Sequence, residues 1–208
     1  MLHSFSGGLD GANPFGSLIL DRSGNLYGAA TVGGTSHGGV ILKFSPAGKE
    51  TVLHNFTYFT DGNDGAGPIG PLVRDASGNL YGITESGGAS GQGVVFKLDP
   101  SGKETLLYTF TGGADGGVPT AGLTRDASGN LYGTTLFGGT VGAGVVFKVS
   151  PTGTETVLYT FTGGADGGNP FGAVLVRDSS GNLYATAGGG GSSACPFGCG
   201  VVFKLTPP

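Results

Sequence analysis

The sequence predicts an all-β fold made of four tandem repeats, each forming a four-stranded antiparallel sheet. Three observations predict it. A five-residue run recurs four times at nearly constant spacing, every repeat contains four short β-forming runs, and the two ends of the chain fall at complementary points of the repeat. No stretch shows the 3.6-residue apolar period of an amphipathic helix.

The repeat is defined by two markers. The run Ser-Gly-Asn-Leu-Tyr recurs at intervals of 54, 51 and 52 residues, starting at Ser23, Ser77, Ser128 and Ser180. A second run, Gly-Val-Val-Phe-Lys, starts at Gly93, Gly144 and Gly200, and the first repeat has Gly-Val-Ile-Leu-Lys from Gly39. The 46 Gly and 11 Pro among 208 residues would suit a disordered chain, but 13 Phe, 7 Tyr and this strict order predict a folded one.

Four strands are expected in each repeat, separated by turn residues. In the second repeat we name them A to D and place them at Pro71–Arg74, Asn79–Thr84, Gly93–Leu98 and Glu104–Phe110. Strands A and B are joined by a turn with Gly78, because glycine readily adopts the positive φ that such turns require. Leu80 and Tyr81 are consecutive and point to opposite faces of strand B, so both faces of the sheet should be buried.

Sheets of this size that pack face to face between two neighbours are the blades of a β-propeller. We expect a single domain over residues 1–208, with blades at about 14–57, 68–111, 119–162 and 170–206 plus 1–6. Leu2–Phe5 aligns with strand D, whereas Gly200–Leu205 is a strand C. The N-terminal strand should therefore pair with the C-terminal blade and close a four-bladed ring, leaving no long edge. An excerpt from a longer array, or two chains sharing a larger ring, would satisfy the same pairing.

The charge pattern excludes some partners. Charged residues make up 12% of the chain and the net charge is −4, so no basic face is expected to bind a nucleic acid backbone. No apolar run approaches the roughly 20 residues that span a bilayer, so direct membrane insertion is not expected.

The repeat resembles the GloVer tandem repeat of exported, often surface-anchored bacterial proteins. The similarity lies in Asp-Ala-Ser-Gly-Asn-Leu-Tyr-Gly-Thr-Thr, in Gly-Val-Val-Phe-Lys and in Leu-Tyr-Thr-Phe-Thr-Gly-Gly-Ala-Asp-Gly, and it extends over essentially the whole chain. The resemblance implies a propeller and a secreted or cell-surface location. It implies no reaction. The absence of Trp is atypical of WD40 and kelch blades.

An acidic residue recurs in the loop from strand D to the next strand A. These loops and the B-to-C loops should emerge on one side of a propeller, where function usually lies. In a closed ring the four carboxylates would surround one axis and could hold Ca²⁺ or orient sugar hydroxyls. The alternative is a turn-forming role for the Asp-Gly pairs. The four residues are Asp10, Asp64, Asp115 and Asp166.

Two other loops break the symmetry of the repeats. The loop before Gly65 is three residues longer than its equivalents and offers Asp61, Asn63 and Asp64 as oxygen ligands. It lacks the full spacing of a Ca²⁺ loop, which favours the alternative of a solvated loop. The last B-to-C loop contains Cys195 and Cys199, which predict a local disulfide in an oxidising compartment.

No residues predict a catalytic reaction or a bound cofactor. His3 and His54 hold the strand D position of Tyr108 and Tyr159, and are expected to be sheet residues facing a neighbour. Glu50, Glu104 and Glu155 should be cross-strand partners of Lys or Thr, and the tyrosines of strand B should pack between blades. We therefore expect a non-enzymatic binding or structural module at the bacterial surface. The alternatives are a carbohydrate-binding or carbohydrate-processing protein, for which a surface glycan or protein would be the partner, and a self-associating subunit of an extracellular assembly.

Overall fold

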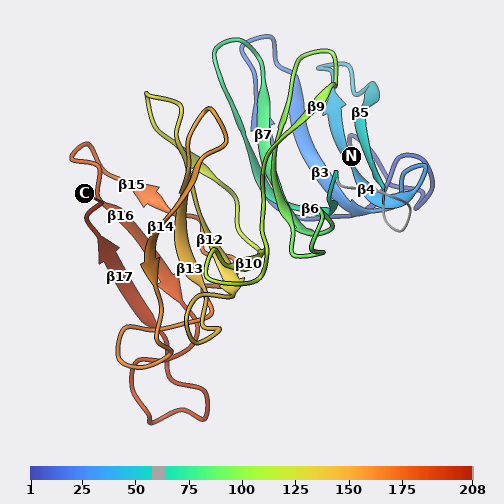
Figure 1. Cartoon of the computed structure of the whole chain (residues 1–208). Helices are drawn as coiled ribbons and strands as arrows, with labels where there is room; N and C mark the ends of the chain where they lie inside the picture. Colours follow the sequence, from blue (N-terminus) through green and yellow to red (C-terminus); the bar gives the residue numbers. More distant parts are fainter. Residues whose placement is uncertain (58–63, 208) are drawn as a thin grey trace.

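The computed structural model describes residues 1–57 and 64–207, and in it the chain folds into four antiparallel sheets, one for each repeat (Figure 1). We call these sheets the first to fourth blades. The first contains β1 (Ala12–Pro14), β2 (Ile19–Leu20), β3 (Leu26–Val32), β4 (His37–Phe44) and β5 (Glu50–Thr57). The second contains β6 (Ala66–Arg74), β7 (Leu80–Ser86), β8 (Val94–Leu98) and β9 (Glu104–Thr109).

The third blade contains β10 (Gly117–Pro119), β11 (Thr124–Arg125), β12 (Leu131–Phe137), β13 (Val145–Val149) and β14 (Glu155–Thr160), and the fourth contains β15 (Val176–Arg177), β16 (Leu183–Ala187) and β17 (Val201–Leu205). The predicted all-β fold with one antiparallel sheet per repeat is confirmed. In the second blade the order β6-β7-β8-β9 makes β9 the outer strand, as β5 and β14 are in their blades. No helix in the described ranges has the length and hydropathy of a membrane span.

The core lies between the blades, which pack face to face along the chain (Figure 1). Leu80 and Tyr81 are 3% and 8% exposed, so both faces of the second blade are buried, as predicted. A phenylalanine of each outer strand meets one in the next blade edge to face: the ring centroids of Phe110 and Phe147 are 5.0 Å apart. Equivalent pairs are Phe56 with Phe96 and Phe161 with Phe203.

Tyr27 in β3, Tyr81 in β7 and Tyr132 in β12 pack between blades, as predicted. Tyr81 receives the guanidinium of Arg125 from the third blade, 5.6 Å from its ring centroid, an attractive cation–π distance. Arg74 lies over Tyr27 and Arg177 over Tyr132 in the same way. The second, third and fourth blades thus each place an arginine on the tyrosine of the blade before them.

The predicted ring closure is not what the structure has. The fourth blade has the order β15-β16-β17, and Leu2–Phe5, which we call the N-terminal segment, does not join it. Phe5 packs instead against the first blade, where it contacts the cluster of Ala30, Val40, Leu42 and Phe44. The N-terminus lies beside the first blade and the C-terminus at the opposite end of the molecule (Figure 1). The four blades therefore form an open arc.

The packing of the N-terminal segment on the first blade follows from the contacts that outer strands make in every repeat. An outer strand makes two kinds of contact, hydrogen bonds to its own blade and side-chain packing onto the next one. The N-terminal segment keeps the second kind, because His3 and Phe5 contact the first blade as His54 and Phe56 contact the second. Pairing with β17 would require the two ends of the arc to meet.

Candidate functional site

The loops after the outer strands and the loops between the two central strands meet on one face. The Gly34 amide donates to the Gly8 carbonyl at 2.9 Å in the first blade, and this bond recurs from Gly139 to Gly113 and from Gly191 to Gly164. Between the first two blades these loops line a cavity of about 550 Å³, with polar groups from Ser36, His37, Glu85 and Ser86. The sequence-based prediction that both loop sets share one face is confirmed for the first, third and fourth blades.

Glu85 is a carboxylate that the sequence analysis did not single out. It occupies the β7 position where β3 has Thr31 and β12 has Leu136, so it breaks the symmetry of the repeats. Burial raises the pKa of the Glu85 carboxyl above its ordinary value. The signal for this residue in the sequence was an acid at a position where the aligned repeats have an apolar or neutral residue.

Each of the four aligned aspartates is held by its own loop. The amide and hydroxyl of Thr111 both donate to the Asp115 carboxylate, the amide at 2.8 Å. Asp10 is bound in the same way by Ser6, Asp64 by Thr57 and Asp166 by Thr162. Hydrogen bonds from Ser6 lower the pKa of Asp10 below its ordinary value. This geometry is that of a turn-forming residue.

The expected ring of four carboxylates around one axis does not form in the open arc. Each aspartate lies beside the outer strand of its own blade; Tyr108 in β9 donates its hydroxyl to Asp115, and Tyr159 in β14 to Asp166, at 3.0 and 2.9 Å. Within the described ranges, the clusters with metal-binding geometry contain one of these aspartates each. A ligand role for the four stays a prediction. Asp61 and Asn63 lie outside the described residues.

Two of the aspartates take part in clusters: Asp64 in one that joins the first and second blades, and Asp10 in one that joins the N-terminal segment to the first blade. His54 in β5 has its Nε2 atom 3.9 Å from Asp64 Oδ2 and 3.8 Å from Glu104 Oε2, and Glu104 belongs to β9 of the next blade. His3 repeats the arrangement one blade earlier, 3.3 Å from Asp10 and 2.9 Å from Glu50. The predicted role of these glutamates as partners of Lys or Thr was wrong, because they face the preceding blade's outer strand.

Burial shifts the ionisation of these clusters. It raises the pKa of the Glu104 carboxyl to about 8, with the Asp64 charge adding to the effect. It also lowers the pKa of the His54 imidazole. Between the second and third blades, Tyr108 takes the place of the histidine. Its hydroxyl donates a hydrogen bond to Asp115, and Glu155 lies beside them. The residue at this one position therefore determines whether an imidazole or a phenol hydroxyl faces the carboxylates between the blades.

Glu155 gives a prediction for the pH dependence of stability. Burial raises the pKa of its carboxyl to about 7, and the Asp115 charge adds to this. The folded chain then binds more protons here than the unfolded chain from about pH 4.5 to 7, so the free energy of unfolding falls as the pH rises through that window. Glu155→Gln should flatten this fall, as measured by urea denaturation at pH 5, 6 and 7. An unchanged slope would contradict the assignment.

The sequence analysis also did not predict the structural role of an aspartate in the first turn of each blade. Asp75 accepts from the Asn79 amide and side chain and from the Tyr81 hydroxyl, at 2.8 to 3.0 Å. Burial alone would raise the pKa of Asp75, but these hydrogen bonds outweigh it and lower the pKa. Asp21, Asp126 and Asp178 are bound in the same way. The network fixes the tyrosine onto which the next blade stacks its arginine.

The predicted cysteine pair is joined in the structure. The Cα atoms of Cys195 and Cys199 are 5.2 Å apart, within the normal range for a disulfide. The bond closes the loop between β16 and β17, where Phe197 is 90% exposed. This loop lies at one end of the arc.

Solved structures identify the architecture as that of a propeller. A gluconolactonase of Xanthomonas campestris is 15% identical, with a TM-score of 0.55 over 92% of this chain and 61% of that chain. A putative glucose dehydrogenase of Thermus thermophilus is 16% identical, with a TM-score of 0.58 over 95% of this chain and 62% of that one. At these identities the likeness shows the fold alone. The chain spans about three fifths of the length of these structures.

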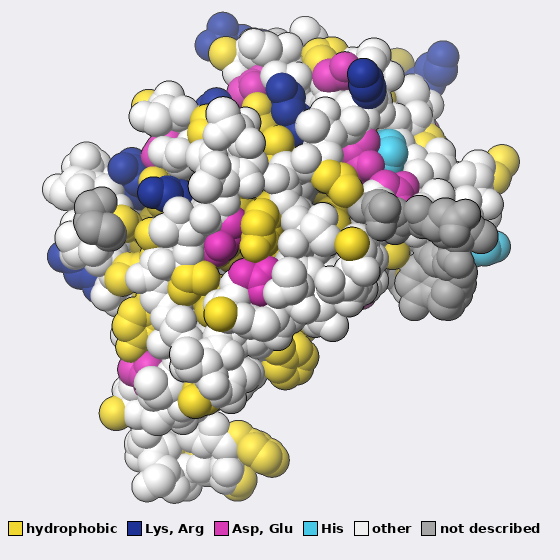
Figure 2. Space-filling model, viewed as in Figure 1, with side chains coloured by type: hydrophobic (Ala, Val, Ile, Leu, Met, Phe, Trp, Pro, Cys, Tyr) yellow, Lys and Arg dark blue, Asp and Glu magenta, His cyan; other side chains and the backbone are white. Residues whose placement is uncertain are grey.

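The repeat itself identifies the family. The Gloeobacter/Verrucomicrobia repeat matches residues 1–129, more than half of the chain. The protein belongs to this family, and the predicted resemblance is confirmed. No curated protein matches the chain. In the view of Figure 2, the Lys and Arg side chains lie toward the upper and left edges of the molecule, whereas Asp and Glu side chains also occupy its middle.

Proposed function

We propose that the protein is a non-enzymatic structural and binding module whose four blades form half of a propeller that two copies complete by head-to-tail pairing. The observation that supports this proposal is that each end of the arc exposes an apolar face, whereas the equivalent faces of the other blades are buried between blades. We call the exposed side of the first blade the leading face (Leu18, Leu20 and Leu26) and that of the fourth blade the trailing face (Val176, Tyr184 and Val202).

The leading face carries apolar side chains like those that a neighbouring blade covers elsewhere, but no blade covers it in the described chain. Leu18 is 53% exposed, whereas the equivalent Leu72, Leu123 and Leu175 are 4%, 3% and 1% exposed. Leu20 replaces the arginine that stacks on a preceding tyrosine in the other blades, and it is 68% exposed. Burying apolar side chains of this size stabilises an interface by roughly 1.5–3 kcal/mol each.

The trailing face shows the same contrast. Val202 in β17 is 82% exposed, whereas the equivalent Ile41, Val95 and Val146 are fully buried by the next blade. Tyr184 has Lys204 of its own blade over its ring and receives no arginine from another blade in the described chain. Stacked repeats bury their faces only through neighbours, so uncovered ends favour association.

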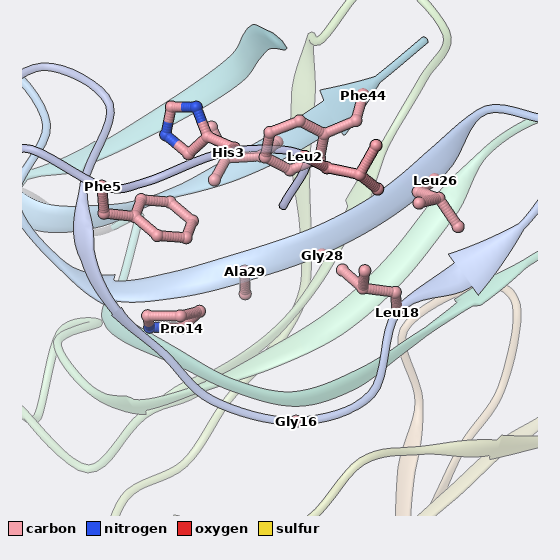
Figure 3. Close-up of a pocket in the computed structure, with 11 residues that line it drawn as sticks. Leu2, His3, Phe5, Pro14, Gly16, Leu18, Leu26, Gly28, Ala29 and Phe44 are labelled. Carbon is pink, nitrogen blue, oxygen red and sulfur yellow. The ribbon is translucent and has the colours of Figure 1, made fainter. Parts of the chain in front are cut away.

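The N-terminal segment marks where the missing blade would lie. Beside it, a cavity of about 370 Å³ is lined by apolar side chains that include Leu2, Phe5, Leu18 and Phe44 (Figure 3). The Leu2 carbonyl faces Gly48 as the Leu53 carbonyl faces Gly102. The segment thus holds the position of an outer strand whose inner strands would fill this cavity.

The fourth blade of a second copy supplies what this position lacks. Its β17 has an unpaired outer edge in the described chain, and the register of β8 with β9 predicts Ser4 opposite Val201 of the other copy. Propellers have four to eight blades, so a ring of two such four-bladed arcs lies within the range. Closure removes both edges and both exposed faces.

A double-cysteine variant tests the pairing directly. Directly opposed residues of antiparallel strands have Cα atoms about 4.5–5.5 Å apart, which suits a disulfide. Ser4→Cys with Val201→Cys should give covalent dimers under mild oxidation, with each single variant as control. Cross-linking within one chain, or no cross-linking, would contradict pairing between copies.

A surface charge should block association without unfolding the chain. Val202→Asp places a carboxylate on the trailing face and should shift the particle to a monomer in light scattering. Phe197→Asp is the matched control, because Phe197 is equally exposed but lies in the disulfide loop. Equal behaviour of the two variants would count against the trailing face as the contact.

A second candidate function is glycan binding at the loop face. The cavity of about 550 Å³ there combines hydroxyl groups of Ser36 and Ser86 with the Glu85 carboxylate, groups that bind sugar hydroxyls. A glycan array with and without Ca²⁺ tests it, and Glu85→Ala should abolish any saturable signal. We also propose a secreted or cell-surface location, because the Cys195–Cys199 disulfide suits an oxidising compartment.

A further inference from the structure

We propose that the clusters His54–Asp64–Glu104 and His3–Asp10–Glu50 each bind a divalent transition-metal ion, the first between two blades and the second between the N-terminal segment and the first blade. In each cluster the histidine nitrogen and one oxygen of each carboxylate lie within 4.8 Å of one another. In the first of them Asp64 and His54 come from the first blade and its following loop, and Glu104 comes from β9 of the second blade. A bound ion would therefore connect two blades.

The distances suit a metal such as Zn²⁺. With Zn–N and Zn–O bonds of about 2.0–2.2 Å, neighbouring ligand atoms of a tetrahedral site lie about 3.4 Å apart. The contacts of His54 Nε2 at 3.8 and 3.9 Å, and those of His3 Nε2 at 2.9 and 3.3 Å, lie on either side of this value. Three protein ligands leave a fourth position for water. An imidazole ligand disfavours Ca²⁺, which takes six to eight oxygens.

Unsatisfied polar atoms in the clusters provide an independent reason. Within the described ranges, the buried Nε2 atom of His54 and the Oε1 atom of Glu104 have no hydrogen-bond partner. The buried Nε2 atom of His3 lies 2.9 Å from Glu50 Oε2 but is not aligned with it for a hydrogen bond. Buried polar atoms are nearly always satisfied, because an unpaired one costs about 1–3 kcal/mol. A metal ion coordinated by Nε2 and by the carboxylates would remove this cost.

The chain contains its own comparison site. Tyr108 holds the position of His54 one blade later, with Asp115 and Glu155 in the places of Asp64 and Glu104. There the tyrosine hydroxyl donates to Asp115 and no imidazole faces the carboxylates. Tyrosine at this position is thus compatible with the fold and removes the nitrogen ligand, which makes the exchange of the two residues a structurally conservative test.

Zn²⁺ binding after treatment with EDTA, measured by equilibrium dialysis and calorimetry, tests the proposal. The unmodified chain should bind two ions, His54→Tyr one, and Tyr108→His three. Tyr159→His is the matched control and should add none, because no glutamate faces Asp166 in the described chain. His37→Ala should leave both ions bound, since His37 is exposed and outside the clusters.

Thermal unfolding separates loss of metal from loss of folding. In EDTA, His54→Tyr should melt close to the unmodified chain, and added Zn²⁺ should raise its melting temperature by less. Unchanged stoichiometry in His54→Tyr would overturn the site at the first interface. Failure of Tyr108→His to add an ion, in a variant that melts normally in EDTA, would overturn the geometric assignment.

Discussion

Phe147→Ala is expected to lower the free energy of unfolding by about 3–5 kcal/mol, the usual cost of emptying a core aromatic position. Phe147 is fully buried and lies edge to face with Phe110 of the preceding blade, so its loss opens a cavity between two blades. Guanidinium denaturation measures the change. Phe197→Ala is the control, because its ring is 90% exposed and it should change stability by less than about 0.5 kcal/mol.

The cost also shows where the stability of the protein comes from. The described blades share no single central core; each pair of neighbours has its own, in which an outer-strand phenylalanine meets the next blade. A loss below about 1 kcal/mol for Phe147→Ala would contradict this view. It would mean that the contact between the second and third blades contributes little.

Gly70→Ala is expected to lower the free energy of unfolding by roughly 3 kcal/mol, the sum of two effects. Gly70 has φ +77°, a conformation that costs other residues about 1–2 kcal/mol. A Cβ atom there would also lie 2.6 Å from the Gly122 nitrogen, where β6 approaches the segment between β10 and β11. The backbones would have to move apart.

Gly142→Ala separates the two effects. Gly142 has nearly the same φ, +79°, but an added Cβ would meet no atom within 4 Å. This variant should show only the conformational cost, about 1 kcal/mol. Thermal and guanidinium unfolding of the two variants side by side give the steric contribution as the difference. Equal losses would show that the close approach at Gly70 is not a constraint.

The blades were predictable from sequence because each depends on local patterns. Turn residues such as Gly78 and the consecutive apolar pair Leu80 and Tyr81 specify strands, turns and burial on both faces, and the structure has all of these. The repetition of the markers then implies that every repeat folds alike. The resemblance to the repeat family rested on the same residues.

Ring closure was not predictable in the same way. Alignment with Leu53–Phe56 predicted that Leu2–Phe5 is an outer strand. The segment forms no strand in the structure, although its side-chain contacts with the first blade follow the pattern of an outer strand. Alignment does not say which sheet edge such a strand pairs with, because every blade offers the same hydrogen bonds. The curvature of the whole arc decides this, and curvature is set by packing such as that at Gly70.

The interblade clusters required the structure for a related reason. The sequence shows that His54, Asp64 and Glu104 recur at fixed places, but they lie in two different repeats. Their meeting depends on the outer strand of one blade facing the outer strand of the next. The exchange of histidine for tyrosine at one aligned position was the only sequence signal for this chemistry.

Sedimentation equilibrium over a concentration series is the most direct test of head-to-tail pairing. Head-to-tail pairing predicts a closed particle with twice the chain's mass of 20.5 kDa. The particle should not grow at high concentration, and it should not form when Val202 is replaced by Asp. A species that stays at 20.5 kDa at every concentration would contradict it, as would one that lengthens without limit.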